Sequence, residues 1–335
     1  MAAISIVTTI AAATLALVVG VSNVPWTDAV GDVLSHLGIG HSALNQVQDA
    51  IVWDLRAPRV AMALVVGAML AVAGGSYQGV FRNPLADPYL LGIAAGAGLG
   101  ATIAITRLAG SNAQGVPTYT PWLAFGGAMA AVALTWSIGG RSRRTSAATL
   151  VLAGVAVSSL LTSLQTYLQQ SSSSAHVETV YLWLLGSLSG ATWAQVWLIV
   201  PYVAVCSLVC VLSGRALDVL SVGDVESRSL GLPVSRVRLL VILASSLGTA
   251  AVVSVVGLVG FVGLIIPHVV RLTVGTSYRR ILPLSITFGA TFLVLADTVA
   301  RSVLSGGEIP LGVVTALIGS PVFVIILRTT NRPTI

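Results

Sequence analysis

Apolar stretches of about 20 residues recur along the whole chain, and they restrict what it can fold into. A helix of that length crosses the hydrocarbon core of a bilayer, which is about 30 Å thick. With 56% hydrophobic and only 8% charged residues, the 335-residue chain has too few polar side chains to cover a water-soluble globule. The sequence therefore predicts an all-α, polytopic membrane protein.

Ten stretches are long and apolar enough to be counted as spans. They lie at residues 4–22, 57–80, 90–107, 120–139, 147–169, 192–212, 237–255, 258–271, 281–303 and 309–328. No large soluble segment remains between them, so we expect one transmembrane domain over residues 1–335. Glycines and a proline within residues 252–267 allow two helices there instead of one long helix.

All 17 basic residues are arginines, and their distribution predicts the orientation, because cytoplasmic loops carry the excess of positive charge. With the N-terminus inside, thirteen arginines are cytoplasmic and four are external. The cytoplasmic set is Arg82, Arg141, Arg143, Arg144, Arg215, Arg228, Arg236, Arg238, Arg271, Arg279, Arg280, Arg328 and Arg332, and the external set is Arg56, Arg59, Arg107 and Arg301. We therefore expect both termini in the cytoplasm.

Several functions are excluded by what the sequence lacks. It has no lysine, and a P-loop needs its lysine to reach the nucleotide phosphates, so any ATP must be bound by another chain. We find no Ser/His/Asp set, HExxH motif or haem-ligating histidine pair, and we predict no catalytic residue, cofactor or metal site. Cys206 and Cys210 fit small core residues on one helix face. His268 is interpreted as a structural hydrogen-bond partner.

Charged residues at the outer ends of two spans run against the usual charge bias. Arg56 and Arg59 share one helix face, and Asp297 and Arg301 are spaced i, i+4. Snorkelling to lipid headgroups and an internal ion pair are the structural interpretations. The functional interpretation is a docking site for carboxylates of an external protein, because the guanidinium fork binds carboxylates in a bidentate manner.

Two cytoplasmic segments also have two interpretations each. FRNPLADP, residues 81–88, holds two prolines that forbid a continuous helix, so it is either a plain turn or a constriction at the inner mouth of a pathway. Residues 215–238 mix acidic residues with arginines, and they form either a solvated loop or two short helices that contact a cytoplasmic partner. Elsewhere, small residues at four-residue spacing, such as Gly67, Ala71 and Gly75 or Gly92, Gly96 and Gly100, predict close helix packing.

Taken together, these stretches resemble the FecCD family of ABC importer permeases. The resemblance rests on six ungapped blocks in the same order, at residues 55–101 (beginning LRAPRVAM), 152–158 (LAGVAVS), 183–193 (WLLGSLSGATW), 229–240 (SLGLPVSRVRLL), 256–285 (beginning VGLVGFVGLIIPH) and 295–327 (beginning LADTVARS). It implies a type II ABC importer permease fold of about ten transmembrane helices in a bacterial inner membrane. The implied cargo is an iron-siderophore complex, haem or cobalamin.

The same resemblance implies partners and site residues. The expected partners are a second permease subunit, identical or not, a cytoplasmic ATPase dimer, an extracytoplasmic substrate-binding protein and membrane lipid, with no nucleic acid. The implied docking residues are Arg56, Arg59 and Arg301, the implied cytoplasmic gate residues are Asn83, Leu85, Thr145 and Ser146, and the implied ATPase-coupling residues within 215–233 are Asp218, Glu226, Gly231 and Leu232.

Two other classes of membrane protein remain as alternatives. An ion-coupled secondary transporter would need an ionisable relay inside the membrane, and no second His or Glu near His268 supplies one. A membrane enzyme would need the catalytic motifs that we do not find. Both would work without a motor chain, so attachment of an ATPase to residues 215–238 separates them from the permease.

Overall fold

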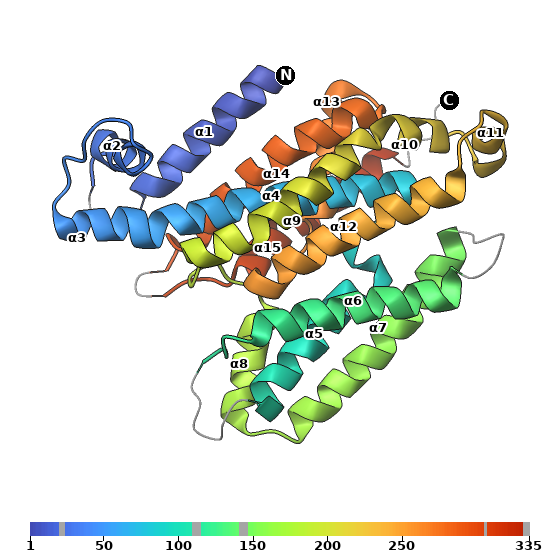
Figure 1. Ribbon diagram of the computed structural model, residues 1–335, viewed down its shortest axis with the longest axis horizontal. Helices are drawn as coiled ribbons and strands as arrows, with labels where there is room; N and C mark the ends of the chain where they lie inside the picture. The colour runs from blue at the N-terminus through green and yellow to red at the C-terminus, as the bar shows by residue number, and fades with distance from the viewer. Residues whose placement is uncertain (20–23, 109–114, 141–146, 305–306, 331–335) are drawn as a thin grey trace.

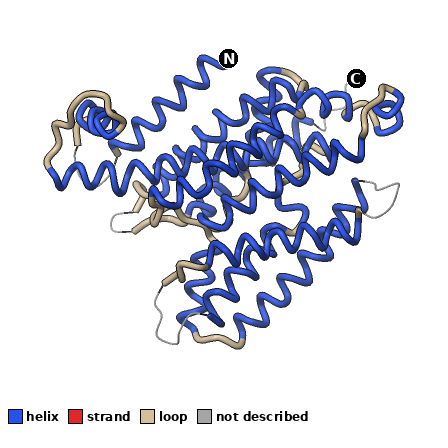
Figure 2. The backbone as a smooth tube through the Cα atoms, viewed as in Figure 1, coloured by secondary structure: helices blue, strands red, loops and turns tan. Residues whose placement is uncertain are grey.

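The computed structural model describes residues 1–19, 24–108, 115–140, 147–304 and 307–330 (Figure 1). Within these ranges the chain is helical and contains no strand, as Figure 2 shows, which confirms the all-α prediction. The helices are α1 (Ala2–Val18), α2 (Trp26–His36), α3 (Gln46–Asp49), the π-helical η1 (Ala50–Arg56), α4 (Ala57–Phe81), the 3-10 turn η2 (Pro88–Leu91), α5 (Ile93–Ile103), the π-helical η3 (Ala104–Leu108), α6 (Thr120–Gly139), α7 (Ala147–Gln170), α8 (Ser174–Leu184), α9 (Trp193–Leu212), α10 (Gly214–Leu220), α11 (Asp224–Ser229), α12 (Val234–Val256), α13 (Val262–Val274), α14 (Tyr278–Ala300) and α15 (Leu311–Thr330).

Each of the ten predicted spans corresponds to a helix. Six are long and apolar enough to cross a membrane alone, at Gln46–Phe81, Thr120–Gly139, Ala148–Gln170, Trp193–Leu212, Val234–Val256 and Tyr278–Ala300. The other four are shorter apolar helices, at Ala2–Val18, Ile93–Leu108, Val262–Val274 and Leu311–Ile325. The expected break lies between α12 and α13, where Gly257 and Phe261 both have a positive φ.

Helix α4 lies at the centre of the molecule, with α14, α12, α13 and α9 packed around it (Figure 1). In the span that contains α4, 83% of the most apolar window is buried, against 33% for α6. A helix that is apolar on every side and buried on every side forms the core of a bundle. A second group, made of α5, α6 and α7 with α8 beside it, packs together below this bundle in the view of Figure 1.

Close packing in both groups depends on glycine, as the four-residue spacing predicted. A Cβ atom on Gly67 of α4 would lie 2.3 Å from the carbonyl oxygen of Gly289 in α14. A Cβ atom on Gly96 of α5 would lie 2.3 Å from the carbonyl oxygen of Gly127 in α6. Only glycine allows these backbones to approach so closely, so the small residues mark helix contacts and not a substrate site.

The long axis of the bundle has two distinct ends. We call the end that carries α2, α3, η1 and residues 301–304 and 307–310 the α2 end, and the opposite end, which carries α10 and α11, the α11 end (Figure 1). Helix α1 runs parallel to α14, because the Thr9 and Thr291 hydroxyls are 2.8 Å apart and Arg301 donates to the carbonyl of Ala16. The C-terminus of α1 therefore lies at the α2 end.

The glycine contact leads to a test of the packing. Replacing Gly67 by valine should separate α4 from α14 and lower stability by about 1–3 kcal/mol, the usual cost of overpacking. Gly126→Val in α6 is the matched control, because a Cβ atom on Gly126 meets nothing within 4 Å. Thermal midpoints from size-exclusion chromatography of the heated detergent-solubilised chain should fall for Gly67→Val only. Equal midpoints would contradict the close contact.

Candidate functional site

Two charged positions at the α2 end are joined through Arg59. Its Nε and Nη2 atoms donate to the Asp297 carboxylate at 2.9–3.1 Å, and its Nη1 and Nη2 atoms donate to the two oxygens of Glu308 at 2.8 and 2.9 Å. One guanidinium therefore forms two bidentate pairs, with a carboxylate from α14 on one side and one from the segment before α15 on the other.

The other two predicted docking arginines bind the end of α1. Arg56 donates through Nη1 to the carbonyls of Leu17 and Val18, at 2.8 and 3.2 Å, and Arg301 donates to the carbonyl of Ala16. The last carbonyls of a helix have no partner within the helix and carry partial negative charge. Both arginines thus complete the C-terminus of α1 and fix it against α4 and α14.

We call Arg56, Arg59, Asp297, Arg301 and Glu308 the arginine cluster. The structure brings the three predicted arginines together, and the predicted Asp297–Arg301 pair is present at 3.8 Å, although Arg59 is the closer partner of Asp297. Arg56 is only 6% exposed, so its guanidinium is held inside the protein. Three positive charges face two negative ones, which leaves one positive charge in excess within the cluster.

Glu308 is the member of the cluster most open to its surroundings, with 41% of its side chain exposed. The hydrogen bonds from Arg59 lower the pKa of the Glu308 carboxyl, against the opposing effect of burial. The same residue lines a cavity of about 580 Å³, whose wall also includes Met62 of α4, Gln195 of α9 and Ser254 of α12. Among the cavity-lining residues Glu308 is the one with a charged side chain, so the cavity offers little charge for selecting a ligand.

At the α11 end, the FRNPLADP segment forms a compact turn. Helix α4 stops at Phe81 because Arg82 has a φ of 49° in the left-handed region. The Asn83 side chain then accepts a hydrogen bond from the Leu85 backbone N–H at 2.9 Å, and the Leu85 side chain is 39% exposed. Asn83 and Leu85 therefore sit on a rigid turn next to the end of the central helix. The other two predicted gate residues, Thr145 and Ser146, lie outside the described residues.

The predicted coupling segment forms two short helices, α10 and α11. Asp218 of α10 accepts hydrogen bonds from the Ser277 hydroxyl at 2.7 Å and the Tyr278 N–H at 2.6 Å, so it caps the start of α14. Glu226 is exposed on α11, Gly231 has a φ of 83°, and Leu232 is half-buried after α11. These four predicted residues lie along one segment but do not form one cluster.

Exposed apolar side chains lie in and beside helix α11. The exposed fractions are 61% for Val222, 70% for Val225 and 71% for Leu230. Three such side chains so close together along the chain are a candidate contact surface. We call these three residues the α11 surface.

Asp224 links this segment to the transmembrane helices, and sequence reasoning missed its role. Its carboxylate pairs with Arg238 of α12 at 3.1 Å and with Arg82, the residue that ends α4, at 3.2 Å. One carboxylate of α11 therefore contacts both α12 and the residue that ends α4. The alternation of acidic residues with arginines in 215–238 was the available signal, but it did not specify which pairs form.

Comparison with known proteins identifies the family and the fold of the chain. The model of the FecCD transport family matches residues 8–329. The cobalamin import system permease protein BtuC of Halobacterium salinarum is 39% identical over 306 residues, which cover 91% of this chain and 80% of that protein. The molybdate import system permease protein MolB of Haemophilus influenzae is 36% identical over 291 residues, 86% of this chain and 84% of that one. A solved structure assigned to the metal-chelate type of ABC transporter, in an inward-facing conformation, has a TM-score of 0.84 at 30% identity and covers 97% of both chains.

The arginine cluster makes a prediction about stability. Asp297→Asn keeps the shape of the side chain but leaves Arg59 and Arg301 with too little negative charge, which should cost about 3–5 kcal/mol, as when one partner of a buried pair is removed. Asp54→Asn, at an exposed position of η1, is the matched control and should leave the thermal midpoint unchanged. If both variants melt like the parent, the cluster does not hold the α2 end together.

Proposed function

Because the chain belongs to the FecCD transport family of ABC importer permeases, we propose that it conducts a large metal-containing chelate into the cytoplasm. Cobalamin is the first candidate cargo, and the observation that carries it is the 39% identity to a cobalamin import permease over 91% of the chain. Iron-siderophore complexes and haem belong to the same class of large chelate. Molybdate, a much smaller oxyanion, is the second candidate because the permease MolB is 36% identical.

We place the α11 end in the cytoplasm. Nine described arginines lie toward this end, and four lie toward the α2 end. The first set is Arg82, Arg215, Arg228, Arg236, Arg238, Arg271, Arg279, Arg280 and Arg328, and the second is Arg56, Arg59, Arg107 and Arg301. The positive-inside rule supports this orientation. Since α1 begins and α15 ends toward the α11 end, both termini are then cytoplasmic.

A separate ATPase dimer supplies the energy in this proposal. The chain has no lysine and hence no P-loop, so it needs a partner for ATP hydrolysis. The α11 surface is the expected contact, with Asp218, Glu226, Gly231 and Leu232 positioning α10 and α11 around it. Closure of the ATPase dimer would displace α11, and Asp224 would transmit the displacement to Arg82 and Arg238 as a rigid-body movement.

The α2 end then faces the substrate-binding protein. An acidic residue of that protein can compete with Glu308 for Arg59, because Glu308 is partly exposed whereas Asp297 is buried. Arg56 and Arg301 stabilise the α2 end by binding the last carbonyls of α1. A second permease subunit, identical or not, completes the pathway, and the nearly uncharged cavity leaves selection of the cargo to the binding protein.

The proposal is tested by transport in liposomes that contain the chain, its ATPase and its binding protein. Cobalamin uptake should require ATP and persist in the presence of a proton uncoupler. Val225→Asp with Leu230→Asp should abolish uptake and ATPase binding, whereas Thr276→Asp, on another exposed loop of the same end, should change neither. Uptake without ATP that collapses with the uncoupler would identify an ion-coupled secondary transporter instead.

Docking makes a separate prediction. Glu308→Gln releases the Nη atoms of Arg59 for an external carboxylate, so the affinity for the binding protein should rise about two- to fivefold, the effect of an exposed ion pair worth at most ~1 kcal/mol. Asp54→Asn removes the same charge at the same end without releasing an arginine, and it serves as the control in a surface plasmon resonance titration. An unchanged or weaker complex for Glu308→Gln would refute competition for Arg59.

A further inference from the structure

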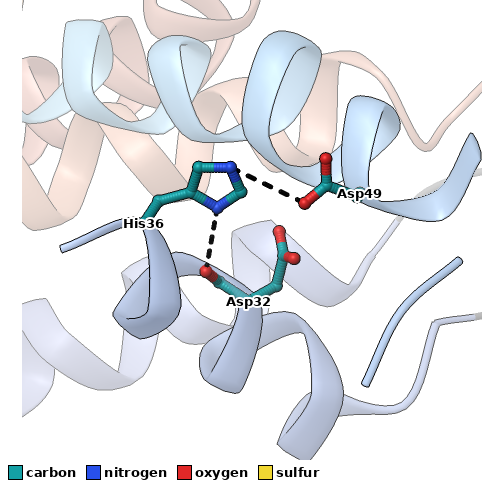
Figure 3. A group of neighbouring side chains, drawn as sticks. All are labelled: Asp32, His36 and Asp49. Atoms are coloured by element: carbon teal, nitrogen blue, oxygen red, sulfur yellow. Dashed lines mark hydrogen bonds and ion pairs between the residues drawn. The ribbon is translucent and has the colours of Figure 1, made fainter. Parts of the chain in front are cut away.

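A group of three side chains at the α2 end has no part in the transport proposal. Asp32 and His36 lie one turn apart on α2, and Asp49 ends α3 (Figure 3). The oxygen and nitrogen atoms that they offer all lie within 4.8 Å of one another. We propose that Asp32, His36 and Asp49 bind one divalent first-row metal ion of the Zn²⁺ class. The sequence predicted no metal site, because it contains no metal-ligand motif and twelve residues lie between His36 and Asp49.

The Asp32 carboxylate is the first observation that points to a cation. The residue is 0% exposed, and its Oδ1 atom accepts a 2.6 Å hydrogen bond from the Ser42 hydroxyl. Its other oxygen, Oδ2, is buried and has no hydrogen-bond partner. In Figure 3 the carboxylate points into the space between His36 and Asp49. A bare carboxylate oxygen that is out of water and near a second carboxylate is costly unless a positive charge lies between them.

The imidazole of His36 is the second observation. Its Nδ1 atom is 3.2 Å from the backbone carbonyl oxygen of Asp32, and because a carbonyl can only accept, Nδ1 carries the hydrogen. In the neutral ring Nε2 then has a free lone pair, and it faces the Asp49 carboxylate at 3.7 Å. A histidine whose Nδ1–H is bound to a backbone carbonyl is in the tautomer that metal-ligating histidines use.

The three ligands are held in place by their surroundings. The His36 ring stacks on Trp53, with ring centroids 4.1 Å apart and planes 10° apart. The Asn45 side chain caps α3 by accepting the N–H groups of Val47 and Gln48, which fixes Asp49 one residue later. The Asp49 and His36 side chains are 36% and 31% exposed, so an ion can enter and water can complete its coordination. Binding Zn²⁺ would require side-chain rotations that bring the donors, now within 4.8 Å of one another, to bond lengths of about 2.0–2.2 Å.

A proton is the competing occupant, and the geometry favours the metal ion. A proton shared between the Asp32 and Asp49 carboxyls would leave the Nε2 atom of His36 without a partner, whereas one divalent ion would contact all three donors. One imidazole with two carboxylates suits Zn²⁺, Mn²⁺ and related ions, while Ca²⁺ and Mg²⁺ prefer oxygen ligands alone.

The metal would join α2 to the helix that carries the arginine cluster. Asp49 directly precedes η1, which continues into α4 through Arg56. The carbonyl oxygen of Trp53 accepts a 2.9 Å hydrogen bond from the Trp193 indole, so the same helix is also fixed to α9. The ion would therefore act as a structural clamp on the α2 end. Its binding does not depend on ATP, cargo or a partner chain, so it can be tested independently of the transport proposal.

The test uses the full chain in nanodiscs, purified with a tag that contains no histidine, stripped with EDTA and dialysed. Zn²⁺ alone is titrated in competition with a chromophoric chelator, and Mg²⁺ serves as the oxygen-preferring control ion. We expect about one Zn²⁺ per chain, and we expect Asp49→Asn and His36→Gln each to weaken binding by at least about tenfold, since loss of a supporting residue alone costs 10–100-fold. His41→Ala, an exposed histidine of the same segment, should bind like the parent.

Thermal midpoints give a second readout that a failure to fold cannot imitate. In EDTA, Asp49→Asn should melt at or above the parent, because it removes the carboxylate that faces Asp32. In Zn²⁺ the order should reverse, because only the parent gains stability from the ion. If Zn²⁺ does not bind, or binds the parent and both ligand variants equally, the metal site is refuted. An Asp49→Asn midpoint above the parent both with and without Zn²⁺ would also refute the site, because the Asp49 carboxylate would then only repel Asp32.

Discussion

Close backbone contact along α4 is the constraint on which the rest of the structure depends. The helix is buried on nearly all sides, and at Gly67 and Gly74 it lies so close to α14 and α13 that no side chain fits between them. Packing of this kind replaces the hydrophobic driving force that lipid does not supply. The same helix runs from one end of the molecule to the other: Arg59 lies near its start at the α2 end, and Arg82 directly follows its last residue at the α11 end.

Each end of that helix is held by one acidic residue with two arginine partners. At the α2 end, Asp297 contacts Arg59 and Arg301, and at the α11 end, Asp224 contacts Arg82 and Arg238. Pairing stabilises these residues, because an unpaired charge near the bilayer carries a high free-energy cost. The planar guanidinium group of arginine can bind two carboxylates at the same time. In the proposed transporter these two pairings connect the binding protein and the ATPase to the same helix.

In the proposed transporter, cargo selection and partner recognition would depend on different features of the chain. The cavity at the α2 end has one charged lining residue, Glu308, and that residue is already bound to Arg59. Relatives named for molecules as different as cobalamin and molybdate are 39% and 36% identical to this chain over the aligned residues. In the proposed transporter, a weakly specific passage that receives its cargo from a selective binding protein would account for both observations. The proposed metal clamp would fix the segment on which such a protein docks.

The amino-acid sequence by itself determined the helical class, the ten spans, the small-residue contacts and the break after Val256, because each of these follows from local composition and spacing. It also indicated the family, through the resemblance of six ungapped blocks. Only the tertiary structure decided that Arg56 and Arg301 bind the end of α1, that Arg59 lies closer to Asp297 than Arg301 does, and that Asp224 joins two helices. It also decided that Asp32, His36 and Asp49 meet. The physical reason is that a buried charge takes the nearest partner in space, and that partner is set by how distant helices pack, which spacing along the chain does not encode.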